Sequence, residues 1–479
     1  MAVQKISDQK SNSANAFKSI NTKSAQAKSG RWLWLCVGMT GVAMVSATAG
    51  ALLAVALSST PLMQTNLSAE EQAIFGKGDR ISRTGLRLTE LTRPVNILVL
   101  GVKVLTSDVS DAPPDQNLGY HALVNSFDGL SDSMLMLRFN PEDKKLNVLS
   151  IPRDTRTLVE GHGVTKINAA NAEGGPALSA QSVSELLNGV PVDRYVRINV
   201  QGVEKLVDAI GGVTVYVPKD MKYQDDSQHL YINLKAGKHH LNGNQALQFL
   251  RFRYDENGDI GRIQRQQLLM RAVTEQALNP AILPRMPKIL SVIQSHIDTN
   301  LTLEELMALV SFGVHTNRAN VQMLMLPGRF SDAGEYNASY WLPDSDRIAT
   351  MMAQHFNVRS QGLQEAIDPA SLKVAIEDST GSNQAVQSLV NSLQESGYHN
   401  VYVAKPWTEP LDVTHIVAQQ GDSDSAQTIR NALGLGEVRV ESTGNLSSDV
   451  TIQLGKDWLQ KQEQFGEKGS EVGVQGSEE

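Results

Sequence analysis

The chain is poor in cysteine, with the single residue Cys36 in a length of 479. One thiol excludes a disulfide framework and a zinc site built from several cysteines. Cys36 lies inside the most apolar stretch of the chain, so we interpret its side chain as a small hydrophobic group. The chain therefore depends on hydrophobic cores, and its length is sufficient for two or three domains.

An excess of basic residues is also missing, because 51 Asp and Glu against 43 Lys and Arg give a formal net charge of −8. Domains that bind nucleic acid are usually basic, so nucleic acid is not an expected partner. The sequence contains no HExxH, no GxSxG and no complete Walker A motif, and its histidines show no metal-ligand spacing. These absences exclude the commonest hydrolase and nucleotide-binding signatures.

One long uncharged run is present, at residues 32–57, and its 26 residues are sufficient to cross a hydrocarbon core of about 30 Å. A cleaved signal peptide is the alternative, but its apolar region is typically about 7–15 residues long. Basic residues precede the run and Glu70 and Glu71 follow it. The positive-inside rule then predicts a single-pass plasma membrane protein with a cytoplasmic N-terminus and an extracytoplasmic bulk.

The predicted location constrains the chemistry. A domain outside the membrane has no ATP, so an enzyme of phosphoryl transfer there needs a substrate that is already activated. Lipid-linked diphosphates meet this need at the same membrane surface.

Composition and pattern predict seven segments. In chain order they are a disordered cytoplasmic tail (1–31), a transmembrane helix (32–57), a juxtamembrane connector (58–93), a large α/β domain (94–357), a linker (358–370), a small C-terminal domain (371–458) and a disordered tail (459–479). Apolar strands at 95–101, 133–139, 146–151, 194–200, 213–217 and 321–325 interleave with helical patterns at 177–187, 202–210 and 302–312. This interleaving predicts an α/β layer whose sheet is covered on both faces. Residues 371–458 predict a small α+β domain of the split βαβ type.

The most informative segment, residues 250–267, contains four arginines: Arg251, Arg253, Arg262 and Arg265. Guanidinium groups gathered in an acidic chain favour a phosphate or pyrophosphate site. Acidic residues lie among the arginines, so a solvated, salt-bridged helix face is the alternative.

The spacing within this segment makes specific geometric predictions. Arg251 and Arg253 share a face only if the backbone is extended. Gly258 and Gly261 predict a turn, after which a helix begins near Arg262 and places Gln266 one turn further along the same face.

Two shorter patterns lie elsewhere. Pro152-Arg153-Asp154 follows a predicted strand, at the edge where α/β sheets usually bind ligands, although a turn with an ordinary surface ion pair is the alternative. Asp132 stands just before an apolar strand, where its carboxylate could hold Mg²⁺ together with substrate phosphates.

Taken in order, these and further motifs resemble the LytR-CpsA-Psr family of cell-wall glycopolymer ligases over about residues 94–357. The motifs are Asn96–Gly101, Ser131–Met134, Ser150–Asp154, Lys166–Ala170 with Gly174-Gly175, Val207–Val213, Leu241–Leu247, Arg251-Phe252-Arg253 and Gly258–Gln267. The C-terminal segment is similar to the LytR C-terminal domain, with Asp378-Ser379 where that domain usually has Asn-Gly.

The resemblance implies a three-layer α/β sandwich with a central mixed β-sheet, anchored by one N-terminal helix. It implies transfer of a glycopolymer from a polyprenyl diphosphate carrier to a cell-wall glycan hydroxyl, with Mg²⁺ as cofactor. It also assigns roles, with Asp132 holding the metal and Asp259 orienting the arginines, and with Asp132, Arg153 and Asp259 as catalytic residues. The residues implied to hold the diphosphate are Arg153, Lys166, Arg251, Arg253, Arg262 and Gln266.

Two positions depart from the family pattern: Lys103 stands where an acidic metal ligand is common, and Leu130 where arginine is common. Candidates for the second metal carboxylate are Asp108, Asp111 and Asp128, and candidates for the general base are Asp154 and Asp132. Two alternatives remain open, a polyprenyl diphosphate phosphohydrolase and a non-catalytic protein that binds the lipid carrier or the wall.

Overall fold

The computed structural model describes residues 62–76, 80–84, 89–103, 127–226, 230–252, 258–358, 369–419 and 421–463. The predicted tail 1–31, the predicted membrane helix 32–57 and most of the segment 104–131 lie outside these ranges. Within them, no helix combines the length and the apolar character needed to span a bilayer.

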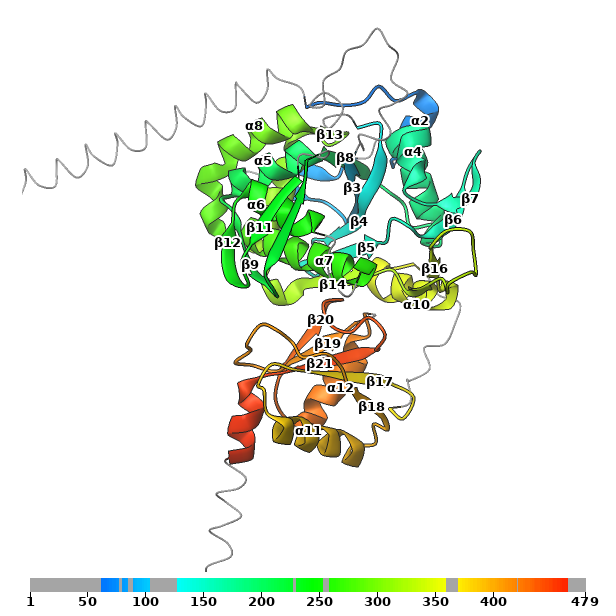
Figure 1. The fold of residues 1–479 in the computed structure, drawn as a ribbon. Coiled ribbons are helices and arrows are strands. Elements are labelled where there is room, and N and C mark those ends of the chain that lie inside the picture. The colour runs from blue at the N-terminus through cyan, green and yellow to red at the C-terminus, as the bar shows by residue number, and fades with distance from the viewer. Residues whose placement is uncertain are drawn as a thin grey trace, which may run out of the picture. The chain divides into compact units, whose positions relative to one another are not determined.

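A six-stranded mixed sheet forms the centre of the larger domain (Figure 1). Its strands, in spatial order, are β13 (Ile297–Thr299), β8 (Arg194–Asn199), β3 (Val95–Lys103), β4 (Leu130–Asn140), β5 (Lys145–Ile151) and β14 (Val321–Met325). The pairs β3–β8 and β5–β14 are parallel, whereas β3–β4, β4–β5 and β8–β13 are antiparallel. The expected α/β fold with a mixed central sheet is thereby confirmed.

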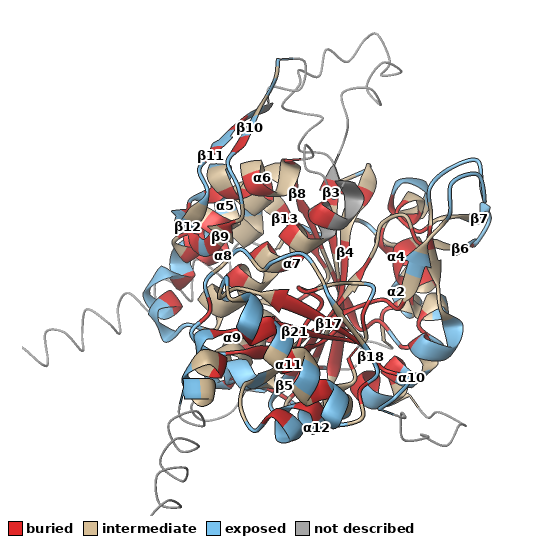
Figure 2. Cartoon of the chain, turned by 60° about the horizontal axis from the view of Figure 1, so that its bottom comes forward, coloured by how far each residue is buried: buried red, intermediate tan, exposed pale blue. Residues whose placement is uncertain are grey.

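Alternate side chains of the strands pack into two different layers. Leu98 and Leu100 of β3 are fully buried against α4 (Ala169–Leu186) and α10 (Ser345–Phe356). Ile97 and Val99 point to the opposite face, which α9 (Leu303–His315) and α7 (Gly258–Ala277) cover through Phe312 and Met270. Figure 2 shows the buried strands of the sheet between helices that expose their outer faces.

Smaller elements surround this sandwich. The two-stranded antiparallel pairs are β1 (Ser82–Thr84) with β2 (Thr89–Leu91), β6 (Arg156–Val159) with β7 (Gly163–Lys166), β9 (Val213–Val217) with β12 (Gly237–Leu241), β10 (Met221–Asp225) with β11 (Leu230–Leu234), and β15 (Gly328–Phe330) with β16 (Trp341–Pro343). The other helices are α2 (Ala69–Ile74), α5 (Val200–Ile210), α6 (Gly243–Arg251), η2 (Pro280–Arg285), α8 (Met286–His296) and η3 (Arg318–Asn320).

The C-terminal domain is built on a five-stranded sheet. Its strands are ordered β18 (Asn400–Val403), β17 (Lys373–Asp378), β21 (Val450–Leu454), β19 (His415–Ala418) and β20 (Glu437–Val440). Helices α11 (Asn383–Glu395) and α12 (Ser423–Leu433) pack on one face, where Ile376, Ile416 and Ile452 are fully buried. The sequence pattern predicts strands at 372–377, 400–404, 414–419, 437–441 and 450–454 and helices at 384–396 and 425–434, and these ranges agree closely with the observed bounds.

Candidate functional site

An apolar pocket of about 380 Å³ lies between the central sheet and the helices that cover one of its faces. Its apolar walls include Val99, Leu135 and Leu137 from β3 and β4, Val203 and Leu206 from α5, Leu269 and Met270 from α7, and Leu306 and Leu309 from α9. Val99 and Leu137 remain partly exposed in the middle of the sheet because they face this space. A volume of this size is typical of sites for small molecules or cofactors.

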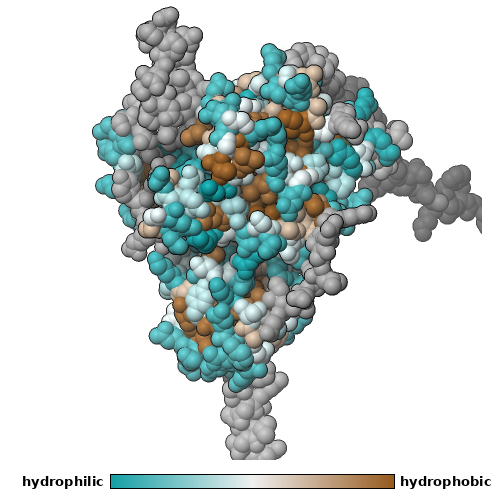
Figure 3. Space-filling view, turned by 90° about the vertical axis from the view of Figure 1, so that its right-hand side faces the viewer, coloured by the Kyte–Doolittle hydropathy of each residue, from teal (hydrophilic) through white to brown (hydrophobic). Residues whose placement is uncertain are grey.

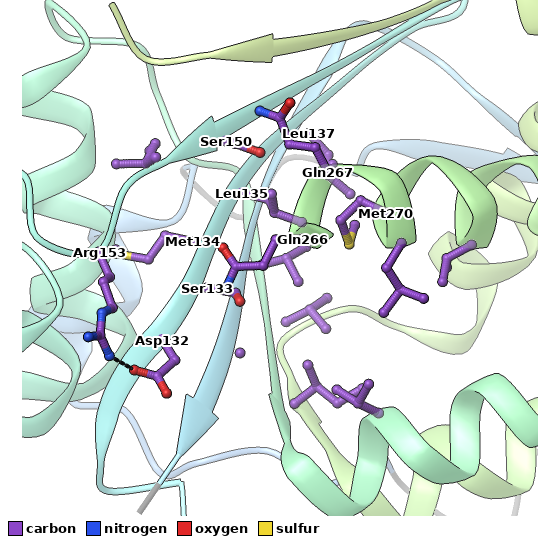
Figure 4. A pocket seen from close by; sticks show the side chains of 18 of the residues that line it. Asp132, Ser133, Met134, Leu135, Leu137, Ser150, Arg153, Gln266, Gln267 and Met270 are labelled. Carbon is purple, nitrogen blue, oxygen red and sulfur yellow. Dashed lines mark hydrogen bonds and ion pairs between the residues drawn. The ribbon is translucent and has the colours of Figure 1, made fainter. Parts of the chain in front are cut away.

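Polar side chains gather at one part of the pocket wall, which we call the polar end: Asp132, Ser133, Arg153, Asp154 and Gln266. Arg153 Nη1 lies 2.5 Å from Asp132 Oδ1, and Arg153 Nε lies 3.4 Å from Asp154 Oδ2. Figure 4 shows the ion pair between Arg153 and Asp132. It also shows the side-chain amide of Gln266, which reaches from α7 toward strand β4. The predicted residues Asp132, Arg153 and Gln266 thus come from three separate elements and meet at one site.

The turn after β5 holds Arg153 and Asp154 in place through the backbone. The Thr155 amide donates to the Pro152 carbonyl at 3.0 Å, and the Asn168 amide donates to the Arg153 carbonyl at 3.2 Å. The Trp341 amide donates to the Asp154 carbonyl at 2.9 Å. These hydrogen bonds fix the turn from both neighbouring segments, so its two charged side chains are directed by a rigid backbone.

A β-bulge directs Asp132. Along β3 and β4, Gly101 pairs with Ser133 and Val102 pairs with Ser131, so the register shifts and Asp132 has no partner residue. Bulges of this kind re-aim a side chain and are frequent beside active sites. Gly101 favours this close pairing, since a Cβ at this position would lie 3.1 Å from that of Ser133 and one of the two strands would have to shift slightly.

The charges at the polar end are coupled. Burial lowers the pKa of Arg153, but the nearby carboxylates of Asp132 and Asp154 and the hydrogen bonds to them outweigh it and raise the pKa above its ordinary value. Lys166 joins the group, with its Nζ 2.9 Å from Asp154 Oδ1. Asp154 therefore faces two cations, and the side chains of Arg153 and Asp132 are only about one quarter exposed (24% and 27%). The Arg153–Asp132 pair is therefore partly buried rather than fully exposed at the surface.

Two further polar groups on the pocket wall are buried without a partner among the described residues. They are the side-chain amide of Gln267 and the indole nitrogen of Trp341. An unsatisfied buried polar group costs about 1–3 kcal/mol, so water or a bound ligand with polar atoms is the expected partner.

The arginine-rich segment differs from the prediction in its backbone. Arg251 is the last residue of helix α6, so the segment around it is not an extended strand, and it is not among the residues that line the pocket. Helix α7 begins at Gly258, so the expected turn at Gly258 and Gly261 is the first turn of the helix. The condition for a shared face of Arg251 and Arg253 is not met at Arg251, because the capping box at Asn242 and Gln245 starts a helix that continues to Arg251.

Arg265 has a structural role. It is 4% exposed, its Nη2 donates to the Phe252 carbonyl at 2.5 Å, and its guanidinium lies 5.7 Å from the Phe252 ring centre. These contacts join α7 to the end of α6. A solvated helix face is therefore wrong for this residue, because the carbonyl and the ring hold its charge inside the protein.

Several predicted residues lie outside the described part of the chain. The structure does not describe Arg253, Asp108 or Asp111. It describes only the backbone of Asp259, Arg262 and Lys103. Their roles remain predictions, as does that of Asp128, which is exposed.

The donors at the polar end fit a metal held by few protein ligands. Among the described residues, no group of three or more His, Cys, Asp or Glu side chains is placed to hold a metal ion. Mg²⁺ is usually bound through one or two carboxylates together with substrate phosphates. Asp132, on the pocket wall, fits that mode rather than a cage built by the protein alone.

The comparison with known families decides the relationship. The model of the LytR_cpsA_psr family matches residues 60–357, more than half of the chain. The chain belongs to the LytR-CpsA-Psr family. A second model, described as LytR cell envelope-related transcriptional attenuator, matches residues 371–458. Both resemblances inferred from the motifs are confirmed.

Two relatives of this chain are named as transferases. The chain is 33% identical over 238 residues to the polyisoprenyl-teichoic acid–peptidoglycan teichoic acid transferase TagU of Bacillus cereus, covering 48% of this chain and 74% of the relative. It is 30% identical over 239 residues to the TagV enzyme of Bacillus subtilis, which carries the same description, covering 48% and 60%. The crystal structure of B. subtilis TagV matches 56% of this chain and 99% of that chain, with 27% identity and a TM-score of 0.45.

Proposed function

We propose that this protein is a cell-envelope transferase that moves a glycopolymer from a polyprenyl diphosphate carrier to a hydroxyl of a wall glycan. The observation that carries the proposal is the joining of an apolar pocket to a polar end with Arg153, Lys166 and Gln266 nearby. A ligand that fits both parts has a long hydrocarbon chain and an anionic head. The names of the TagU and TagV relatives, which act on polyisoprenyl-linked teichoic acid, support the same substrate class.

Each residue at the polar end has a distinct task in this proposal. Arg153 binds oxygens of the diphosphate through its planar fork, and Gln266 donates an amide hydrogen to the same group. Asp154 orients Arg153 and Lys166, since it contacts both. The apolar walls exclude water from the carrier, which favours transfer to a glycan hydroxyl over hydrolysis.

Displacing a polyprenyl phosphate requires neutralisation of charge on both the transferred and the leaving phosphate. Asp132 would hold Mg²⁺, which when bound supplies part of that neutralisation. We further propose that residues 32–57 anchor the chain in the plasma membrane with the site on the extracytoplasmic side, close to its lipid-linked substrate.

The decisive experiment incubates the full-length chain with a polyprenyl diphosphate-linked glycan, Mg²⁺ and a wall-glycan acceptor. A sugar–phosphate–acceptor adduct is expected. Released phosphate without an adduct would instead identify a phosphohydrolase. Tight binding without any turnover would identify a non-catalytic binding protein.

Substitution of Asp132 tests the metal. Asp132→Asn should lower the transfer rate by about 10²-fold, because neutralising the carboxylate removes an electrostatic group that acts at the phosphates. Diphosphate binding, measured at increasing Mg²⁺ concentration, should show that the same variant has a weaker affinity for Mg²⁺ than the wild type. Asp143→Asn, in the exposed turn between β4 and β5, is the matched control and should behave as wild type. Full activity of Asp132→Asn with unchanged Mg²⁺ dependence would remove Asp132 from the metal site.

A further inference from the structure

A short β-hairpin, β15–β16, connects the apolar pocket to the protein surface. Phe330 of β15 and Trp341 of β16 line the pocket, and residues 331–340 between the two strands carry Tyr336 and Tyr340. The rings of these tyrosines pack edge to face, with their centres 5.4 Å apart. A hydrogen bond joins this hairpin to the polar end of the pocket, because the Trp341 amide donates to the carbonyl of Asp154.

The β6–β7 hairpin meets the same tyrosines. Arg156 pairs with Lys166 across the hairpin and Leu158 pairs with Val164, so all four side chains share one face. The Arg156 guanidinium lies 4.9 Å from the centre of the Tyr336 ring, and Lys166 Nζ lies 5.6 Å from that of Tyr340. Lys166 also forms the ion pair with Asp154, so this face continues directly from the polar end of the pocket.

This surface, which we call the hairpin face, consists of Arg156, Leu158, Val164, Lys166, Tyr336 and Tyr340. Leu158 is 54% exposed, Val164 is 53% exposed and Tyr336 is 37% exposed, although each is large and hydrophobic. Figure 3 views the side of the molecule on which Figure 1 places β6, β7 and β16, and there hydrophobic patches alternate with hydrophilic groups. Exposed apolar groups beside a candidate active site, mixed with Tyr and Arg, are typical of a recognition surface.

We propose that the hairpin face is the subsite for the acceptor, a saccharide chain of the wall glycan. The inference rests on the proposed transfer, because a hydroxyl that displaces the lipid phosphate in line must approach from outside the pocket that holds the lipid. The tyrosine rings and the aliphatic pair offer apolar surface to the C–H groups of sugar rings. The phenols, Arg156 and Lys166 offer hydrogen bonds to hydroxyl and carboxylate groups.

The charges around the hairpin tip favour a glycan over a lipid surface. Glu160 is exposed in the β6–β7 turn, and Glu173 lies 3.6 Å from His162 of the same turn. Anionic lipid head groups attract basic segments and are repelled by carboxylates. The acidic tip next to Leu158 and Val164 is therefore a poor contact for an anionic membrane surface.

The test measures glycan binding and lipid binding separately in the full-length chain. Tyr336→Ala and the double variant Leu158→Ser/Val164→Ser should weaken binding of a purified, uncrosslinked wall-glycan oligosaccharide by about tenfold. Binding of geranylgeranyl diphosphate should not change. Tyr231→Ala, which removes a tyrosine that is 53% exposed on β11, is the matched control and should bind both probes as wild type does.

Kinetics provide a second measurement. Where transfer occurs, Tyr336→Ala should raise KM for the acceptor while kcat stays unchanged, and Tyr336→Phe, which keeps the ring, should remain close to wild type. If the full-length chain forms no adduct but the variants still lose glycan binding, the proposed transfer fails and the subsite stands. Wild-type glycan affinity in Tyr336→Ala and in the double variant would overturn the subsite. The subsite would also be overturned if the wild-type chain bound phospholipid vesicles and these variants did not.

Discussion

Arg153→Ala should lower the rate of glycopolymer transfer by about 10²–10³-fold while the melting temperature stays close to that of wild type. The guanidinium contacts Asp132 and Asp154 at the polar end of the pocket, and its side chain is 24% exposed rather than enclosed in a core. Its loss removes positive charge where the diphosphate would sit. Arg153→Lys should recover only part of the activity, because an ammonium group lacks the planar fork that binds two oxygens at once.

The measurement is transfer to a wall-glycan acceptor by the full-length chain, with thermal unfolding recorded on the same samples. Arg347→Ala is the matched control, since Arg347 is half exposed and forms its ion pairs with Asp344 and Asp449 outside the pocket. A large drop in melting temperature with intact activity per folded molecule would show that Arg153 is a structural residue.

Val99→Trp should abolish binding of the lipid carrier without unfolding the protein. Val99 lies in the middle of β3, is only partly buried and faces the apolar pocket, so a larger side chain there fills existing space. Burial of each methylene group stabilises by about 0.8 kcal/mol, so excluding only three of them weakens binding by roughly 50-fold. Filling a cavity commonly leaves stability unchanged or raises it.

Binding of geranylgeranyl diphosphate, compared with inorganic diphosphate as a probe of the polar end alone, is the measurement. Val99→Trp should lose the first and retain the second. Val413→Trp places the same substitution at an exposed valine of the C-terminal domain and should bind both probes normally. Unchanged affinity for the lipid probe in Val99→Trp would show that the pocket does not hold the carrier.

Local patterns in the sequence were sufficient for several parts of this site. The turn Pro152-Arg153-Asp154 follows a buried strand, so its position at the sheet edge could be predicted. The spacing of Gln266 on a helix was likewise correct, although helix α7 begins earlier than expected. Arg265 was counted in the arginine-rich segment without a role of its own, and its role depends on the Phe252 carbonyl, a contact between the ends of two helices that no spacing rule reveals.

The pocket could not be predicted, for a physical reason. Leu98 and Val99 are neighbours of similar hydrophobicity, yet Leu98 is buried in a packed core and Val99 faces an open space. Alternation assigns them to opposite faces of the sheet but does not show whether the layer beyond each face is filled. Only the packing of α5, α7 and α9 against the sheet determines that.

The sequence by itself determined the mixed α/β class, the family and the residue types of an anion site, because these depend on periodicity, turn chemistry and motif order. The tertiary structure decided which residues meet. It joined Asp132, Arg153, Lys166 and Gln266 to an apolar pocket, and it placed Tyr336 and Tyr340 against a hairpin more than 160 residues earlier in the chain. These pairings follow from strand register, from the bulge at Asp132 and from side-chain packing between distant segments, which only the assembled chain provides.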